Sequence, residues 1–135
     1  MRREFRLPAE DEEYLDSTGL DWETIVEGGL RWLILLDRPV PAGYTVTKSH
    51  TALLIQPGYP DAELDMVYFD PPVSRADGGP IGALATQQIQ GRSWQRWSRH
   101  RTPQNPWRPG VDAIPTHLVL VDHWLRWALA GGAAA

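Results

Sequence analysis

The chain has 135 residues, a formal net charge of -4 at pH 7, 42% hydrophobic residues and 22% charged residues. This composition is ordinary for a packed globular protein, and we expect one domain over residues 1–135, with its core at about 7–129 and a frayed tail at 130–135. Because the chain has no cysteine, disulfides, thiolate metal sites, iron–sulfur clusters and thioester chemistry are excluded. The longest apolar run, Trp32 to Leu36, is too short to span a membrane, and no signal peptide is recognisable, which predicts a cytoplasmic protein.

The first half of the chain predicts one short helix and four strands. Residues 8–16 have proline in the first turn and acids that complement the positive end of a helix dipole, and Ser17-Thr18-Gly19 ends the helix. The acids form either a solvated helix face or a docking face for a basic partner. Apolar segments bounded by glycine, proline or aspartate predict strands at residues 22–27, 30–36, 51–55 and 66–69. The short connections between these strands favour an antiparallel meander.

A polar, glycine-rich segment over residues 73–90 predicts a long loop, which a basic, tryptophan-rich stretch continues. The candidate binding residues in and after this stretch are Trp94, Arg96, Trp97, Arg99 and Trp107. Arginine and tryptophan together suit nucleic acid, but the stretch lacks lysine and the whole chain is acidic, so nucleic acid is a disfavoured partner. Trp94 and Trp97 are alternatively core residues.

The last element has the clearest pattern. Its apolar positions are spaced by four, three, four and three residues and therefore share one helical face: Ile114, Leu118, Val121, Leu125 and Ala128. Asp112 is the expected N-cap, and Gly131-Gly132 is expected to end the helix. A long helix packed on an antiparallel meander gives an α+β fold.

The histidines are the main candidates for chemistry. His117 flanks the apolar helix face and is expected to be partly buried with its hydrogen bonds satisfied, while His123 is expected at the surface. His50 opens the third strand. His100 lies among four arginines, whose positive charge favours the neutral imidazole that acts as a base or nucleophile.

The carboxylates show no defined acid/base pair. Asp61, Glu63 and Asp65 alternate and are expected to be solvated edge charges, whereas Asp70 ends a strand next to the long loop. No phosphate-binding, dinucleotide-binding, nucleophile-elbow or zinc-protease motif occurs, and we expect no metal and no cofactor.

The order of the elements resembles the ubiquitin-conjugating-enzyme-like (UBC-like) fold: a short helix, a four-stranded meander with Tyr-Pro and Pro-Pro, a long active-site loop, Trp-x-Pro and a helix. Here Tyr59-Pro60 and Pro71-Pro72 stand for the first signature, more widely separated than usual, and Trp107-Arg108-Pro109 stands for the second. More narrowly, the chain resembles the bacterial UBC-like proteins called prokaryotic family E. The residues that carry this resemblance are Leu7-Pro8, Glu10-Asp11, Tyr14-Leu15, Gly58-Tyr59-Pro60, Asp70-Pro71-Pro72, Trp94 to His100 and Trp107 to Gly110.

This resemblance implies a part in a bacterial ubiquitin-like modification pathway. The partners it implies are a ubiquitin-like protein with tandem β-grasp domains, a ubiquitin-activating-enzyme-like protein and a JAB-type peptidase. Authentic conjugating enzymes place a cysteine in the loop ahead of Trp-x-Pro, with His-Pro-Asn upstream, and neither is present here. Thioester transfer by this chain is therefore excluded.

Two hypotheses remain, and the first is favoured. In it, the chain is a UBC-like module without catalytic activity that binds the ubiquitin-like protein or its activating enzyme. In the second, a site without cysteine transfers an acyl group, with Arg96 or Arg99 holding an anion, and its candidate catalytic residues are His100, Ser98, Asp70 and His50. A His100 within hydrogen-bond reach of one of the other three in a cleft would favour this second hypothesis, whereas a His100 that faces open solvent would argue against it.

Overall fold

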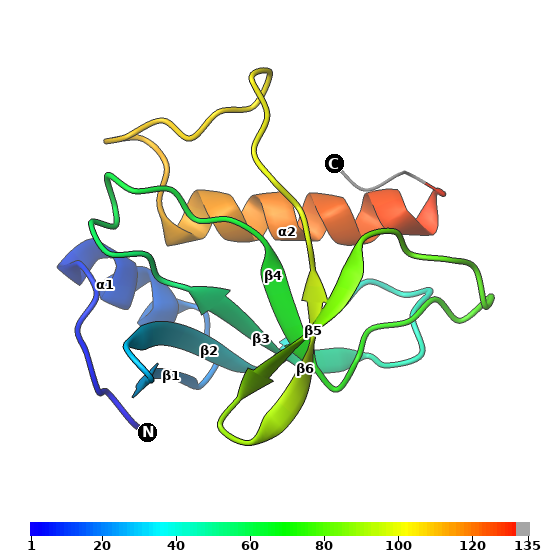
Figure 1. The fold of residues 1–135 in the computed structure, drawn as a ribbon, viewed down its shortest axis with the longest axis horizontal. Helices are drawn as coiled ribbons and strands as arrows, with labels where there is room; N and C mark the ends of the chain where they lie inside the picture. The colour runs from blue at the N-terminus through cyan, green and yellow to red at the C-terminus, as the bar shows by residue number, and fades with distance from the viewer. Residues whose placement is uncertain (132–135) are drawn as a thin grey trace.

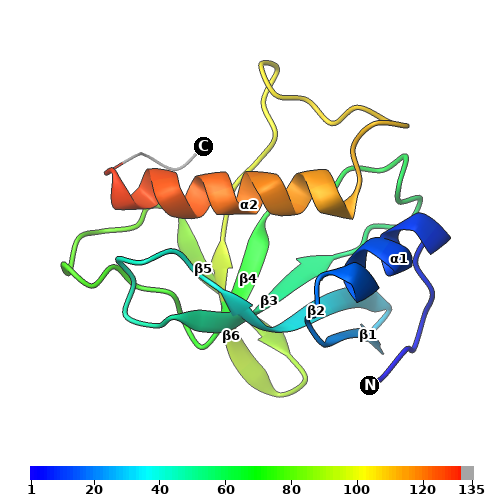
Figure 2. The ribbon, with the colours of Figure 1, turned by 180° about the vertical axis from the view of Figure 1, so that it is seen from behind.

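The fold is a six-stranded antiparallel sheet with a long helix across one face and a short helix near one end (Figures 1 and 2). The structure is a computed structural model and describes residues 1–131. Its elements are α1 (Ala9–Ser17), β1 (Trp22–Glu27), β2 (Leu30–Pro39), β3 (Lys48–Leu54), β4 (Val67–Asp70), β5 (Leu84–Ile89), β6 (Arg92–Trp97) and α2 (Ile114–Leu129). The predicted α+β class and both helices are confirmed. The prediction of four strands was wrong, because the sheet has six in the order β1-β2-β3-β4-β6-β5.

The two additional strands, β5 and β6, lie in the segment that the sequence predicted as a loop. Neither strand shows the alternation of apolar and polar residues that marks a half-buried strand. β5 is polar because it is an edge strand with much of its length exposed to solvent. In β6, Trp94 and Trp97 are an odd number of residues apart and point to opposite faces of the sheet, yet both are buried.

The hairpins β1–β2 and β5–β6 close through the same kind of turn. Gly28-Gly29 and Gln90-Gly91 occupy the two loop positions, and all four residues have positive φ angles, as a type I′ turn requires. The sheet curls so that the tip of the second hairpin meets the first. Gln90 N–H donates a hydrogen bond of 2.9 Å to a carboxylate oxygen of Glu27 at the end of β1.

Apolar side chains fill both faces of this curled sheet. Under α2, one core joins buried side chains from the strands and the helix, among them Leu33, Leu35, Leu53, Phe69, Trp97, Leu118, Val121 and Leu125. The opposite face, called the open face below, carries a second cluster of Ile25, Trp32, Ile34, Ala52, Tyr68, Ile89 and Trp94. In this second cluster, the rings of Trp32 and Tyr68 meet edge to face at 4.9 Å.

The face of α2 predicted to be apolar is buried against the sheet, as expected from its spacing. The N-cap prediction was wrong: Ala113 is the N-cap, and Thr116 Oγ1 accepts a hydrogen bond of 3.0 Å from its N–H. The Asp112 carboxylate instead accepts from Arg108 N at 2.8 Å, which fixes the turn before the helix. The helix ends at Leu129 with Ala130 as its C-cap, and Gly131 follows with a φ of 81°, so the predicted glycine stop is confirmed at Gly131. Residues 132–135, which include Gly132 and most of the predicted frayed tail, lie outside the described residues.

α1 is tied to the start of α2 by a tyrosine. The Tyr59 hydroxyl donates to Asp11 Oδ2 at 2.6 Å, and the hydroxyl oxygen accepts from Ile114 N–H at 2.8 Å. Asp11 is therefore buried in this contact rather than solvated, and burial raises the pKa of its carboxyl group. Across residues 1–131, no helix combines the length and apolar character needed to cross a membrane.

Candidate functional site

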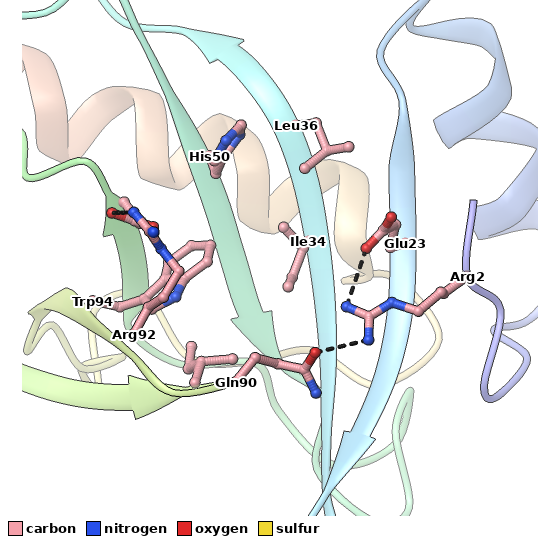
Figure 3. Close-up of a pocket in the computed structure, with 10 residues that line it drawn as sticks. Arg2, Glu23, Ile34, Leu36, His50, Gln90, Arg92 and Trp94 are labelled. Carbon is pink, nitrogen blue, oxygen red and sulfur yellow. Dashed lines mark hydrogen bonds and ion pairs between the residues drawn. The ribbon is translucent and has the colours of Figure 1, made fainter.

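The residues singled out from the sequence lie in two separate places. His50, Asp70 and Trp94 line a pocket on the open face of the sheet (Figure 3). His100 and Trp107 belong instead to the segment that leads from β6 to α2. The structure therefore brings His50 and Asp70 together, and His100 has a different carboxylate partner, described below.

The open-face pocket lies between β1–β2 and the tip of the β5–β6 hairpin, with a cavity volume of about 420 Å³. Arg2 reaches across it, and its guanidinium donates to Gln90 Oε1 at 2.7 Å and to Glu23 Oε2 at 3.4 Å (Figure 3). The pocket combines an apolar floor with a polar rim, and its lining residues are Arg2, Glu23, Ile34, Leu36, His50, Asp70, Ile89, Gln90, Arg92 and Trp94. His100 is not among the residues that line this pocket.

His50 and Asp70 are directly opposite each other on β3 and β4, but each has its own partner. His50 Nδ1 accepts a hydrogen bond of 3.0 Å from Asp37 N, so the ring proton is on Nε2 when the histidine is neutral. The Asp70 carboxylate is buried and accepts from Arg92 Nε at 2.7 Å and Nη2 at 3.4 Å. Asp70 thus positions Arg92 at the pocket rim.

His100 pairs with an aspartate that the sequence did not assign to it. Its Nδ1 lies 2.9 Å from Asp65 Oδ2, and its side chain is 56% exposed. An aspartate on Nδ1 favours the tautomer with Nδ1–H, in which Nε2 carries the free lone pair. Ser98 Oγ accepts from Arg96 Nε at 3.1 Å, so the serine hydroxyl is held by an arginine rather than by His100.

A pocket of about 240 Å³ lies between this histidine and the outer side of α2. It is lined by side chains of the connecting segment and of the helix: His100, Thr102, Asn105, Leu120, His123, Trp124 and Trp127. The His123 ring stacks on Trp127, with centroids 6.2 Å apart and planes inclined by 24°. His123 is thus exposed as predicted and belongs to this pocket.

A buried polar network holds the connecting segment in place. Arg101 Nη2 lies 2.9 Å from His117 Nδ1, and His117 Nε2 lies 3.0 Å from the carbonyl oxygen of Met66. Burial lowers the pKa of His117 to about 4, so the ring is neutral near pH 7, donates through Nε2–H and accepts at Nδ1. Arg101 also lies 3.9 Å from the buried Asp112 carboxylate and 4.7 Å from the Trp107 ring. These contacts make His117 a structural residue, more deeply buried than predicted.

The remaining predicted binding residues support the fold. Trp94 is buried in the open-face cluster, and Trp97 is buried under α2 beside Phe69. Arg99 is also buried, and its guanidinium donates to the Gly82 carbonyl at 3.0 Å, while burial lowers its pKa. Trp107 Nε1 donates to the Pro60 carbonyl at 3.0 Å. In β6, therefore, the tryptophan rings are not available to stack on nucleic-acid bases.

Sequence reasoning missed the contacts that Asp65, Arg101 and Asp112 make around the two histidines His100 and His117. Asp65 was expected to be a solvated edge charge, although its alternation with Asp61 and Glu63 gave no sign of which carboxylate would meet His100. Only the approach of the segment before β4 to the segment after β6, shown by the 3.1 Å bond from Met66 N to the Arg99 carbonyl, brings the pair together. Within the described part of the chain, no group of three or more His, Asp or Glu side chains is arranged to hold a metal ion.

The comparisons with known proteins give one match. The family model described as "Prokaryotic E2 family E" matches residues 7–128, from just before α1 to the last turn of α2. No curated protein and no solved structure matches the chain. The match covers the two helices, the complete sheet and the connecting segment with His100, and the chain therefore belongs to prokaryotic E2 family E.

Proposed function

We propose that the protein is a cysteine-less UBC-like module of a bacterial ubiquitin-like modification pathway. In this role it binds a ubiquitin-like protein, its activating enzyme or both, without forming a thioester. One observation carries the proposal: the family model spans residues 7–128, yet no cysteine exists anywhere in the chain to carry an acyl group.

The contacts of the predicted catalytic residues support this proposal. Ser98 is held by Arg96, His50 accepts from a backbone N–H, and Asp70 is engaged by Arg92. A residue whose polar atoms already have structural partners must break those contacts before it reacts, which raises the barrier to chemistry. Binding makes no such demand.

The experiment combines the purified chain with ATP, a bacterial ubiquitin-like protein with tandem β-grasp domains and its activating enzyme. Size-exclusion chromatography and intact-mass measurement are read together. Co-elution with an unchanged mass is the expected result. If the chain neither co-elutes with a partner nor changes mass, the proposal is wrong.

The contact expected for acyl transfer does not form, because His100 bonds to none of the other three candidate residues and its side chain is 56% exposed. Its pair with Asp65 offers a second candidate function by another route, which is acyl transfer through histidine. In this reaction His100 Nε2 attacks the carbonyl carbon of the ubiquitin-like protein's activated C-terminus. The new C–N bond forms as the C–S or C–O bond to the activating enzyme or to AMP breaks, and the leaving group takes the bonding electrons. Asp65 stabilises the charge that develops on the imidazole through the 2.9 Å contact with Nδ1.

The same mass measurement separates the two functions. Acyl transfer predicts an adduct on the chain that hydroxylamine removes and that His100→Ala abolishes. Asp65→Asn should then slow its formation, whereas Ser98→Ala should leave the yield unchanged because Ser98 is bonded to Arg96. An adduct that persists in His100→Ala rules out the histidine route.

A further inference from the structure

The two edges of the sheet differ in how their backbone groups are satisfied. In both hairpins a two-residue type I′ turn joins the strands, so the pairs that flank the turn, Glu27 with Leu30 and Ile89 with Arg92, exchange hydrogen bonds. Hydrogen-bonded pairs then alternate along each hairpin with pairs that are not hydrogen-bonded, and residues in the latter direct their N–H and C=O groups away from the partner strand. On the edge strand β1 these outward positions are Trp22, Thr24 and Val26; on the edge strand β5 they are Leu84, Thr86 and Gln88.

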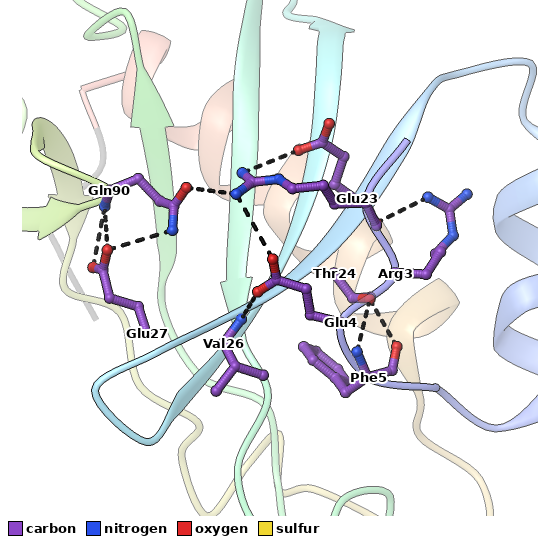
Figure 4. A network of polar contacts seen from close by, with 9 residues as sticks. Arg3, Glu4, Phe5, Glu23, Thr24, Val26, Glu27 and Gln90 are labelled. Carbon is purple, nitrogen blue, oxygen red and sulfur yellow. Dashed lines mark hydrogen bonds and ion pairs between the residues drawn. The ribbon is translucent and has the colours of Figure 1, made fainter.

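The N-terminal segment covers the outward groups of β1 (Figure 4). Thr24 N–H donates to the Arg2 carbonyl at 3.0 Å, and its carbonyl accepts from Glu4 N at 2.8 Å. Val26 N–H donates to Glu4 Oε1 at 2.8 Å, and the Trp22 carbonyl accepts from Arg3. All three outward positions of β1 therefore have a partner, which agrees with the alternation deduced from the turn.

Nothing equivalent covers β5 within residues 1–131. Ser98 N donates to the Ala83 carbonyl at 2.9 Å, which continues the ladder and confirms that residues 84, 86 and 88 face outward. Among the described contacts, none joins the N–H groups of these three residues to an acceptor, and only the Gln88 carbonyl has a partner, Gln87 Nε2 at 3.2 Å. All three residues are exposed.

β5 also lacks the features that normally prevent strand addition. Its sequence, Leu-Ala-Thr-Gln-Gln-Ile, has no charge and no proline, and Leu84 is 42% exposed at its start. Natural edge strands usually carry lysine, proline, a bulge or a covering segment, because unpaired backbone groups are a template for another strand. The N-terminal segment of this chain covers the β1 edge, whereas the β5 edge is open to a strand from a partner.

The charge beside β5 indicates which strand fits. Arg96 is two residues from Trp94 on β6 and therefore shares the open face with it. It is directly opposite Ala85, so at this position only a methyl group stands between Arg96 and the free edge. Among the described residues, no carboxylate lies within ion-pair distance of Arg96, whose Nε is bonded to Ser98. An added strand antiparallel to β5 runs from the Ile89 end to the Leu84 end and so brings its C-terminus toward Arg96 and Ser98.

We propose that β5 binds an extended, uncharged C-terminal segment of the ubiquitin-like partner as a seventh, antiparallel strand, with Arg96 receiving its terminal carboxylate. This inference rests on the proposed function for the identity of the partner. Main-chain hydrogen bonds to residues 84, 86 and 88 supply affinity, and the arginine supplies preference for a free chain end. A second copy of the chain is a weaker occupant, since its own β5, Leu-Ala-Thr-Gln-Gln-Ile, has no carboxylate to pair with Arg96.

The test compares Thr86→Pro with Thr86→Ala. Both remove the threonine side chain, but only proline removes the outward N–H, and it breaks no bond to β6 because that N–H faces away from the ladder. The probes are the ubiquitin-like protein and a synthetic peptide of its C-terminal segment, measured by calorimetry. Thr86→Pro should weaken both by roughly tenfold, and Thr86→Ala by less than about twofold. Far-UV circular dichroism shows whether each variant is folded.

Arg96→Gln tests the carboxylate and does not depend on the proline variant folding. Arg96→Gln should weaken binding of the free-acid peptide and leave binding of the same peptide with an amidated C-terminus unchanged. The amidated peptide should bind the unaltered chain as weakly as the free-acid peptide binds the variant. In the unaltered chain, peptide binding should also slow hydrogen exchange at the amides of residues 84, 86 and 88.

The remaining outcomes overturn the inference in distinguishable ways. If the ubiquitin-like protein binds but Thr86→Pro and Arg96→Gln leave its affinity unchanged, the proposed function stands and the β5 site is wrong. If neither probe binds, the β5 site is wrong, and the proposed function then depends on co-elution with the activating enzyme alone. If the chain alone forms a dimer that Thr86→Pro abolishes, the edge pairs with a second copy instead.

Discussion

Replacing His117 by glutamine tests whether a buried neutral histidine makes the fold sensitive to acid. His117 is fully buried, donates through Nε2–H to the Met66 carbonyl at 3.0 Å, and accepts at Nδ1 from Arg101 at 2.9 Å. A glutamine side chain has an NH2 group that can donate to the Met66 carbonyl and a carbonyl oxygen that can accept from Arg101, but it does not titrate. The substitution therefore removes the ionisation while keeping the hydrogen bonds.

The sign and size of the effect follow from the pKa of this group. Burial first, and the charge of Arg101 in addition, lower the pKa of His117 from 6.5 to about 4. Between these values the unfolded chain binds a proton that the folded chain does not, so stability is lost as pH falls through this window. From pH 8 to pH 5 the loss attributable to His117 is about 2 kcal/mol in the free energy of unfolding.

The assay is urea unfolding followed by tryptophan fluorescence, for the unaltered chain and His117→Gln, at several pH values from 8 to 5. The difference between the two free energies of unfolding cancels the contributions of other titrating groups. As the pH falls from 8 to 5, His117→Gln should gain about 2 kcal/mol in free energy of unfolding relative to the unaltered chain. If it stays constant over that range, His117 does not titrate as argued here and the reasoning is refuted.

Three further substitutions probe contacts that hold the fold together. Tyr59→Phe removes the hydroxyl bonded to the buried Asp11 carboxylate and should cost about 2–4 kcal/mol in urea unfolding, with the loss smaller where acid protonates Asp11. Arg92→Ala leaves the buried Asp70 carboxylate without its two hydrogen bonds and should lower the urea midpoint, and Asp70→Asn in the same chain should restore part of that loss. Gly43→Ala adds a Cβ at φ +113°, 3.0 Å from a Leu129 methyl group, and should lower the thermal midpoint by several degrees, about 1–3 kcal/mol. An unchanged midpoint for Gly43→Ala would contradict the strain assigned to it.

The expected outcomes differ in where they act. The substitutions at His117, Tyr59 and Arg92 each alter the hydrogen bonds of a buried titratable side chain, so their effects should appear in stability rather than in partner binding. The variants at the exposed Thr86 and the half-buried Arg96 alter groups beside the free edge and should change binding with little effect on stability. If the first group changed binding without changing stability, or the second group changed stability without changing binding, the roles assigned to the buried contacts and to the β5 edge would be wrong.

The sequence by itself determined the elements whose pattern is local. The 3.6-residue repeat from Ile114 to Ala128 defines the buried face of α2, and four apolar segments mark β1 to β4 with ends shifted by a few residues. The absence of cysteine excludes a thioester whatever the fold. These properties could be predicted because each depends on neighbouring residues or on composition alone.

Only the tertiary structure decided the properties that depend on distant segments. β5 is polar because its edge meets solvent, and β6 lacks alternation because both faces of the sheet are covered at Trp94 and Trp97, so neither strand has a local signature. The pairing of Asp65 with His100, 35 residues apart, results from the packing of two loops. The contrast between the covered edge at β1 and the open edge at β5 exists only once the strands are ordered, because a backbone group is free or paired according to which strand lies beside it.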